Sequence, residues 1–317
     1  MNTQHIPVLY NRVVEFLRPK PDGVYIDGTV GLGGHSAAIL ETSAPDGRVI
    51  GIDLDVEALS IAEDRLRAFG ERCSLVNGNF AEMDVLLERY SVHAVDGILL
   101  DLGVSSLQLD TPHRGFSFSH TGPLDMRMNS REALGSDRNT TMTAMQIVND
   151  SPMDVLADIF KRYGEERFAK RIAHRVVRAR QQEPITTTTQ FAEIVKQTVP
   201  QKVSKIHPAT RVFQALRIHV NAELENLEAG LDAAVSLLKL NGCLCVITFH
   251  SLEDRIVKHR FRTWAKTCIC PPKTPVCICE HSPSVEILTK RPVLPNETEI
   301  QQNPRARSAK LRAVRKL

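Results

Sequence analysis

Three carboxylates, Asp27, Asp53 and Asp101, each end an apolar segment in the first third of the chain. A carboxylate at the end of a buried strand can accept hydrogen bonds from the two hydroxyls of a ribose. S-adenosylmethionine (SAM) also carries an ammonium and a sulfonium group, which acids stabilise, and it lacks the pyrophosphate of a dinucleotide. The three acids therefore favour SAM over a dinucleotide as the ligand of this part of the chain.

A glycine-dense turn, residues 28–34, connects the first of these segments to a predicted helix that starts at His35. Glycines allow positive φ angles and let a ligand approach the backbone without Cβ collisions. The N–H groups at the start of the helix can hold an anionic group. Dinucleotide, flavin and SAM binders share such loops, so the loop alone is a weak signal. Asp53, 20 residues after Gly33, stands where a ribose-binding acid is expected.

Strand and helix patterns alternate from residue 23 to residue 103, which predicts a parallel, doubly wound sheet. Ligands of such sheets bind beyond the carboxyl ends of the strands. We expect the glycine loop, Asp53, Phe80 and Asp101 all to lie at that edge. The predicted fold class is therefore α/β, with a Rossmann-like doubly wound sheet.

The alternation stops after Asp101 for about a hundred residues. A long irregular segment reaches residue 128, and helical patterns follow over residues 141–148, 152–163, 165–182 and 190–199, with Ser151 as the predicted N-cap of the second. A helical region broken near Asn221 and ended by Gly242 leads to a fifth strand, and residues 285–288 and 309–314 are candidates for antiparallel edge strands. We predict a core formed by residues 1–109 and 206–317, interrupted by a helical domain over residues 110–205.

The composition is that of an ordinary globular protein, with 317 residues, of which 42% are hydrophobic and 24% charged. The sequence contains no apolar run of about 18 residues, so no membrane span is predicted. The first seven residues lack the features of a secretion signal. Seven cysteines, an odd number, suit a reducing compartment better than a disulfide framework. We therefore expect a cytoplasmic protein without a membrane partner.

Lysine and arginine concentrate in two zones, although the net charge is only +3. Eight lie between Lys161 and Arg180, and six lie between Arg305 and Lys316. Such zones are typical of proteins that bind a polyanion, and a solvated helix face or a charged tail explains each zone about as well. Next to a SAM site, RNA or DNA is the favoured partner, with binding that weakens steeply as salt is added.

Long motifs extend along nearly the whole chain, namely Asp27–Ser36, Asp101–Asp110, Arg114–Phe118, Gly122–Met128, Tyr163–Arg167, His207–Arg211, Phe213–Ile218, Phe249–Arg255 and Asn303–Ser308. Together these motifs resemble those of the ribosomal RNA small subunit methyltransferase H family.

The resemblance implies a class I SAM-dependent methyltransferase with an inserted α-helical domain, which we expect to recognise RNA. It implies methylation of the exocyclic N4 of one cytosine in the decoding region of bacterial 16S rRNA, either as naked RNA or within the small ribosomal subunit. SAM contacts carry over to Gly33, Gly34, His35, Asp53, Phe80, Asp101 and Gln108.

The chemistry of the implied reaction calls for a proton acceptor near the target base. The amino lone pair of cytosine is delocalised into the ring, so the enzyme must align it and accept its developing charge. Asp101 is the first candidate by position, unless it is committed to SAM. His250 follows the fifth strand and is a second catalytic candidate, although a helix start capped by Ser251 explains this stretch nearly as well. Phe116, Phe118 and His250 are candidates for stacking on the base.

Cys268, Cys270, Cys277 and Cys279 together offer four thiolates to a zinc ion. A single residue between the members of each pair is less usual than two, so the sequence favours no metal and leaves a zinc site as the alternative.

Two other functions remain open at this point. An NAD(P)-linked oxidoreductase would use the same kind of sheet, and a non-catalytic assembly factor would bind RNA without SAM. A titration with SAM and NADH separates the three, and the oligomeric state is left open.

Overall fold

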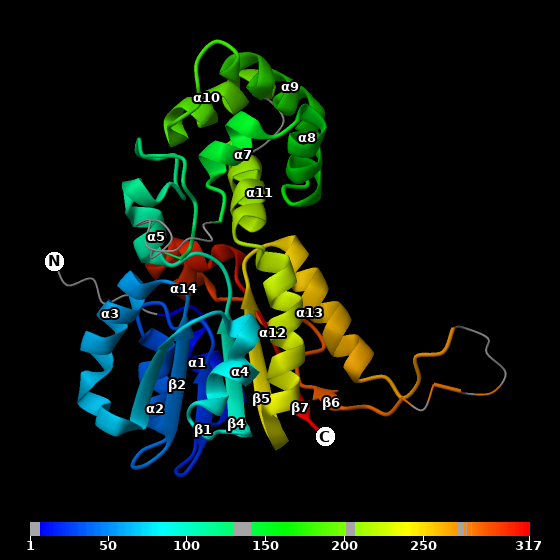
Figure 1. Cartoon of the computed structure of the whole chain (residues 1–317). Coiled ribbons are helices and arrows are strands. Elements are labelled where there is room, and N and C mark those ends of the chain that lie inside the picture. Colours follow the sequence, from blue (N-terminus) through cyan, green and yellow to red (C-terminus); the bar gives the residue numbers. More distant parts are fainter. Residues whose placement is uncertain (1–6, 130–140, 201–206, 272–275, 277, 280) are drawn as a thin grey trace. The chain divides into compact units, whose positions relative to one another are not determined.

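The computed structural model describes residues 7–129, 141–200, 207–271, 276, 278, 279 and 281–317 (Figure 1). Cys277, which the sequence analysis names as a candidate zinc ligand, lies outside the described residues. The chain divides into two compact units, the first formed by Met1–Gly103 and Leu224–Leu317 and the second by Val104–Glu223. The boundaries between the two units therefore follow residues 103 and 223, whereas the boundaries predicted from the sequence follow residues 109 and 205.

The first unit contains a seven-stranded sheet with the order β3-β2-β1-β4-β5-β7-β6. The strands are β1 (Val24–Asp27), β2 (Arg48–Asp53), β3 (Cys73–Asn77), β4 (Val95–Asp101), β5 (Leu238–Thr248), β6 (Val285–Ile287) and β7 (Lys310–Lys316). The first five are parallel, and β7 is antiparallel to both β5 and β6. The predicted doubly wound sheet and its antiparallel edge strands are confirmed.

Helices cover both faces of this sheet because successive strand residues point to opposite sides. The helices of the unit are α1 (Tyr10–Leu17), α2 (Gly34–Thr42), α3 (Val56–Leu66), α4 (Met83–Glu88), α12 (Glu223–Leu237), α13 (Ser251–Trp264) and α14 (Glu297–Gln302). On one face Ile26, Ile50 and Ile98 pack with residues of α4, α12 and α13. On the other, Tyr25 and Leu99 pack with residues of α1, α2 and α3. Strand residues buried on both faces explain the nearly continuous apolar runs in the sequence.

The second unit is helical, with its own core of apolar residues. Its helices are α5 (Ser106–Asp110), α7 (Ala144–Asp150), α8 (Met153–Arg162), α9 (Ala169–Arg180), α10 (Thr188–Thr198) and α11 (Thr210–Val220). All four helices predicted between residues 141 and 199 are present with shifted ends. Two local predictions are wrong: Pro152, not Ser151, precedes α8, with no side-chain cap bond, and α12 ends at Leu237 instead of near Gly242.

The long segment after α5 is ordered by side chains that bond its backbone. The Arg114 guanidinium is buried and donates to the carbonyl oxygens of Arg127 and Met128. Asp125 accepts two hydrogen bonds of 2.8 Å from the Arg127 guanidinium. The side-chain oxygen of Asn221, just after α11, accepts a bond of 2.8 Å from the Met128 N–H. These bonds explain how a segment without regular structure is held in place.

Within the described parts of the chain, no helix combines the length and the apolar character needed to cross a bilayer.

Candidate functional site

The glycine loop between β1 and α2 requires glycine at two positions for different reasons. Gly33 precedes α2 with φ +77°, and a Cβ there would lie 3.1 Å from Cδ1 of Leu66. Gly34 has room for no side chain because its Cβ would lie 2.5 Å from Cγ of Pro7. The N-terminal lead-in, as far as it is described, therefore contacts the start of α2. No side chain among the described residues caps this helix, so N–H groups of its first turn are available to a ligand in this part of the structure.

Asp27 anchors the loop from beneath. Its carboxylate is fully buried and accepts hydrogen bonds from the Ser36 hydroxyl at 2.6 Å and the Thr29 N–H at 3.3 Å. Burial raises the pKa of Asp27, and the Ser36 bond and the nearby His35 ring oppose that rise. Asp27 thus ties β1 to α2, which gives this carboxylate a structural role.

Asp53, at the end of β2, holds the loop from the side. One carboxylate oxygen accepts from the Gly31 N–H at 2.7 Å and the other from the Asp55 N–H at 2.9 Å. Burial raises the pKa of Asp53 to about 6, and these two N–H donors oppose the rise. Asn77 at the end of β3 pairs with Asp53 in register and donates to its carbonyl oxygen at 3.0 Å. The carboxylate predicted to hold a ribose therefore stands beside the glycine loop.

His35 and Asp101 meet at the same edge of the sheet. The Nε2 atom of His35 lies 3.6 Å from a carboxylate oxygen of Asp101, which ends β4. Among the described residues, neither ring nitrogen of His35 nor Oδ1 of Asp101 has a hydrogen-bond partner, although all three atoms are buried. The Asp101 N–H donates to the Thr29 hydroxyl at 2.6 Å, which fixes the backbone here. Buried polar atoms without partners are rare in proteins, and here they indicate a place prepared for a polar ligand.

Phe80 lies directly after β3 and faces α12. A Cβ on Gly230 of α12 would lie 2.4 Å from its ring, and a Cβ on Gly28 would lie 3.2 Å from its own Cβ. The ring is therefore packed into the core beside the loop. Gln108 belongs to the second unit, where it forms a reciprocal capping box with Ser105 at the start of α5.

His250 caps α13. Its Nδ1 accepts from the Glu253 N–H at 3.4 Å, its Nε2 lies 3.1 Å from Oε1 of Glu253, and Oε2 of Glu253 accepts from the Phe249 N–H at 2.8 Å. The cap is therefore His250 and not Ser251 as the sequence suggested. A catalytic role for His250 stays a prediction.

The two phenylalanine rings considered for stacking, those of Phe116 and Phe118, pack within the second unit. Phe116 is a buried member of its core, and Phe118 stacks on His207 with ring centroids 4.6 Å apart. Packing contacts within the second unit therefore account for the presence of both phenylalanines.

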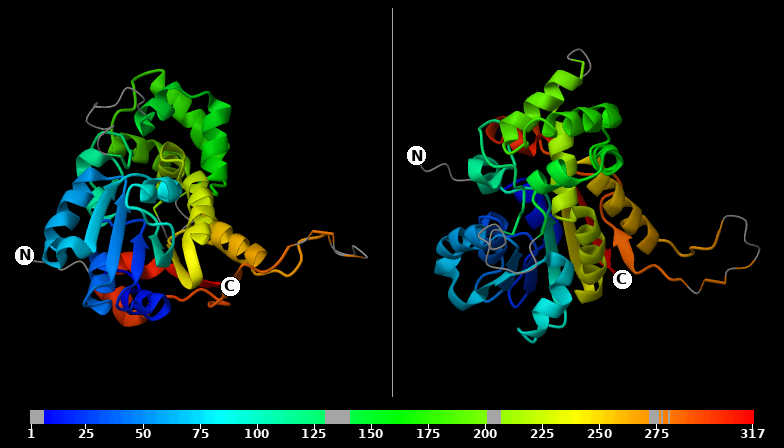
Figure 2. Two further views of the ribbon diagram at one scale, coloured as in Figure 1. Left: turned by 60° about the horizontal axis from the view of Figure 1, so that its bottom comes forward. Right: turned by 45° about the horizontal axis from the view of Figure 1, so that its top comes forward.

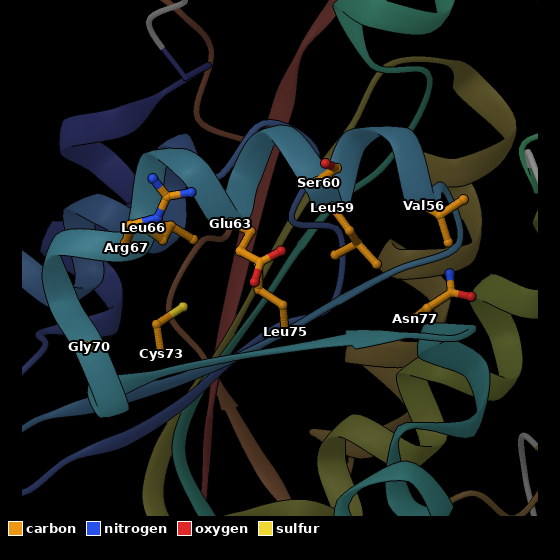
Figure 3. A pocket seen from close by; sticks show the side chains of 10 residues that line it. All are labelled: Val56, Leu59, Ser60, Glu63, Leu66, Arg67, Gly70, Cys73, Leu75 and Asn77. Atoms are coloured by element: carbon orange, nitrogen blue, oxygen red, sulfur yellow. The ribbon is translucent and has the colours of Figure 1, made fainter.

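A hollow of about 550 Å³ lies between α3 and the edge strand β3 (Figure 3). Figure 3 shows Leu59, Glu63 and Leu75 pointing into it, with Asn77 at one end and Cys73 at the other. Burial raises the pKa of the Cys73 thiol to about 11, so this thiol stays protonated. None of the residues expected to contact SAM lines this hollow, so it is distinct from the site at the glycine loop.

The two basic zones differ in how their charges are used. Seven of the eight basic residues between Lys161 and Arg180 are exposed, and α9 carries no acid. In the second zone Arg312 bonds Asp254 at 2.7 Å, Lys310 lies 3.7 Å from the same acid, and Lys316 donates to a carbonyl of α12. Burial raises the pKa of Asp254, but the hydrogen bond from Arg312 outweighs this effect and keeps that pKa below its ordinary value. The first zone therefore presents more exposed basic side chains than the second, in which Arg305 and Arg307 are exposed.

Two side chains that organise the site were not singled out from the sequence. Thr29 holds the end of β4, and Ser36 bonds the buried Asp27. Both are short hydroxyl residues within or just after a glycine-rich turn, where a side chain can bond a nearby backbone or carboxylate group. That placement is the signal that identifies them.

The sequence profile of the MraW methylase family matches residues 2–317. The chain is 54% identical over 316 residues to the Ribosomal RNA small subunit methyltransferase H of Syntrophotalea carbinolica, covering 99% of this chain and 98% of that protein. It is 52% identical over 319 residues to the protein of the same name from Geobacter sulfurreducens, covering 100% of both. A solved rRNA methylase from Streptococcus thermophilus gives a TM-score of 0.41 at 11% identity, covering 97% of this chain and 93% of that one.

Proposed function

Because this chain belongs to the MraW methylase family, we propose that it transfers a methyl group from SAM to small-subunit ribosomal RNA. The acceptor we propose is the exocyclic N4 of one cytosine in the decoding region of bacterial 16S rRNA. The structural observation that carries the proposal is the set of buried polar atoms of His35 and Asp101, which have no partners in the described part of the chain and lie beside a glycine loop.

The residues at the carboxyl edge of the sheet fit SAM. Bound SAM supplies an electrophilic methyl group on a sulfonium. Asp53 offers carboxylate oxygens to the ribose hydroxyls. Gly33, with φ +77°, shapes the turn before α2, and we assign the N–H groups of the first turn of this helix to the carboxylate of the amino-acid end of SAM.

Asp101 is the residue we assign to the acceptor base. Its free carboxylate oxygen accepts a hydrogen bond from the cytosine amino group, which localises the lone pair and receives the proton as nitrogen becomes positive. The Thr29 bond fixes its backbone, and alignment of this kind can contribute several kcal/mol, on the order of magnitude known for oriented reactions. His250 is assigned to orienting the base through the α13 cap rather than to proton transfer.

The exposed basic surface of α8 and α9 is the part of the second unit that we assign to RNA. Phosphates dominate RNA affinity, and a helix that carries arginine and lysine without acids is suited to them. Recognition through the phosphate backbone leaves the choice of base to the site at the glycine loop.

Mapping of methylated nucleotides by mass spectrometry tests the proposal. Small-subunit RNA from cells lacking the protein should miss one methyl group on a decoding-region cytosine. The purified protein with SAM should restore that methyl group, and an Asp101→Ala variant should not. The loss of a methyl group elsewhere would refute the base assignment, and a complete set of methyl groups would refute the proposed activity.

A further inference from the structure

A twenty-residue loop, residues 265–284, connects α13 to β6 in the first unit. Its base is closed by the Ser284 N–H, which donates to the Trp264 carbonyl at 2.9 Å, and by Nε2 of His281, 3.2 Å from the Thr263 carbonyl. The two limbs run side by side away from the sheet (Figures 1 and 2). None of its described residues belongs to a helix or strand, and long irregular connections are uncommon in compact domains and are usually functional or held by another device.

Apolar burial does not hold the described part of this loop together. Ile269, Val276 and Ile278 are 49%, 73% and 80% exposed, respectively. None of these residues contributes to a core of the first unit. Since ordering a loop costs conformational entropy, some other interaction must join the two limbs.

Three thiols from the two limbs meet beyond the closed base. The sulfur atoms of Cys268, Cys270 and Cys279 all lie within 4.8 Å of one another. The Sγ atoms of Cys268 and Cys279 are 3.7 Å apart. The Ile269 N–H donates to Sγ of Cys279 and the Cys270 N–H to Sγ of Cys268, each at 3.4 Å. The three thiols therefore share one small volume with N–H groups directed at two of them.

The 3.7 Å separation between the Sγ atoms of Cys268 and Cys279 matches the geometry of a zinc–thiolate centre. A zinc–sulfur bond of about 2.3 Å in a tetrahedron places neighbouring sulfurs about 3.8 Å apart. N–H groups that donate to the sulfurs stabilise thiolate charge, as outer-shell groups do around bound metals. Soft thiolates select zinc among the common divalent ions, and a site with no role in redox chemistry suits a structural ion.

We propose that Cys268, Cys270 and Cys279 bind one structural Zn²⁺ that joins the two limbs of the 265–284 loop. On binding, each thiol releases its proton to solvent and forms a zinc–sulfur bond, so zinc affinity rises with pH. The zinc–sulfur bonds offset the conformational entropy that is lost when the loop is closed. The sequence offers another thiol at Cys277, outside the described residues, and the proposal rests on the three described thiols alone. The zinc site is independent of the methyl-transfer function.

Metal analysis of the full-length protein, produced with zinc and freed of loosely bound ions by gel filtration, is the direct test. One zinc per chain is expected, and replacing it with Co²⁺ should give the absorption bands of a tetrahedral cobalt–thiolate centre. Cys268→Ser and Cys279→Ser should each reduce zinc retention against a chelator at least tenfold. Cys73→Ser is the matched control, because the raised pKa of that thiol in β3 makes it a poor ligand, and it should retain one zinc.

Limited proteolysis supplies a readout that does not depend on metal counting. Lys266 lies in the loop, so trypsin should cut there faster after zinc is removed by a chelator, and added zinc should restore protection. Far less than one zinc per chain, or full zinc retention by both serine variants, would overturn the proposal. Stoichiometric iron with the visible absorption of an iron–sulfur cluster would overturn the assignment to zinc.

Discussion

The Nε2 atom of His35 lies 3.6 Å from a carboxylate oxygen of Asp101, at the point where the first turn of α2 meets the end of β4. Both side chains have buried polar atoms that no described residue satisfies. Leaving such atoms unpaired costs about 1 to 3 kcal/mol each, so a protein retains them where a ligand pairs them. The pair of His35 and Asp101 therefore indicates the position of the ligand site more directly than the glycine loop does, because the loop also has the structural role of connecting β1 to α2.

Asp101→Asn tests whether the carboxylate receives the proton of the amino group. The amide keeps the size of the side chain but cannot take up a proton, so we expect the turnover number to fall by about 10²- to 10⁴-fold. SAM affinity, measured by calorimetry, should change little if Asp101 serves the acceptor base. A loss of SAM affinity with equal loss of turnover would instead assign Asp101 to the cofactor. Asp64→Asn, on the exposed face of α3, is the control and should leave both unchanged.

The pH dependence of SAM binding should report Asp53. Its pKa is raised to about 6, and the ribose hydroxyls need the carboxylate form as acceptor. Affinity should therefore fall as the pH drops below about 6, and Asp53→Asn should bind weakly without that dependence. Titrations of SAM between about pH 5 and 8 check this, and an affinity that stays constant over that range would contradict the assignment.

The Asp53 carboxyl group should also affect folding stability, but its contribution should fall as the pH rises, whereas SAM affinity should rise. Its pKa is higher in the folded chain than the ordinary value of 3.8, so the folded state binds more protons between those two values. The contribution of Asp53 to stability is fully present below about pH 4 and is lost as the pH rises through about 6. At about pH 7.5 Asp53→Asn should raise the free energy of unfolding by roughly 1 to 3 kcal/mol, measured by urea denaturation without SAM. Unchanged or lower stability would show that the N–H bonds of Gly31 and Asp55 outweigh burial.

Gly33→Ala and Gly70→Ala form a matched pair. Both glycines have positive φ, +77° and +56°, so alanine should cost each about 1 to 2 kcal/mol of folding stability. A Cβ at Gly33 also approaches Leu66 to 3.1 Å, whereas one at Gly70 meets nothing within 4 Å. Only Gly33→Ala should lower SAM affinity, because only that loop borders the ligand. Equal losses of SAM affinity in the two variants would exclude a direct role for the loop.

The order of helices and strands was predictable because the periodicity of apolar residues and the acids at the ends of strands are visible in the sequence itself. The alternation up to Asp101 predicted the parallel strands, and residues 285–288 and 309–314 correctly indicated antiparallel edges. The ends of the elements were less predictable, since tertiary contacts decide them. Helix α12 ends at Leu237, five residues before Gly242, because Leu238 already pairs with Val95 of β4.

Side-chain roles were harder to predict than elements because a residue type does not reveal its partner. Arg312 and Lys310 belong to a run of basic residues, yet both form ion pairs with Asp254 in the distant α13. His250 follows a strand like a catalytic residue, yet its ring caps a helix. Asp27 and Asp53 both end strands, and only the structure shows that Ser36 occupies the first while the second borders the loop.

The basic face of α9 should carry a measurable share of RNA affinity. The four exposed residues to be replaced by glutamine are Lys170, Arg171, Arg175 and Arg178. Each phosphate contact contributes about 0.7 to the slope of log affinity against log salt for single-stranded RNA, so the slope should become shallower by up to about 3. Filter binding with a decoding-region RNA at several salt concentrations measures this.

A second variant with the same change of charge separates local contact from net charge in that experiment. It replaces four exposed basic residues of the first unit, namely Arg67, Arg89, Arg262 and Lys290. Its salt slope should change by less than about 1, because general attraction falls off within a Debye length of roughly 8 to 10 Å. If the slope of log affinity against log salt becomes shallower by the same amount in both variants, α9 acts only through net charge and the RNA-binding face lies elsewhere. If the α9 variant alone loses affinity while SAM binding is retained, the helical unit binds RNA independently of the cofactor site.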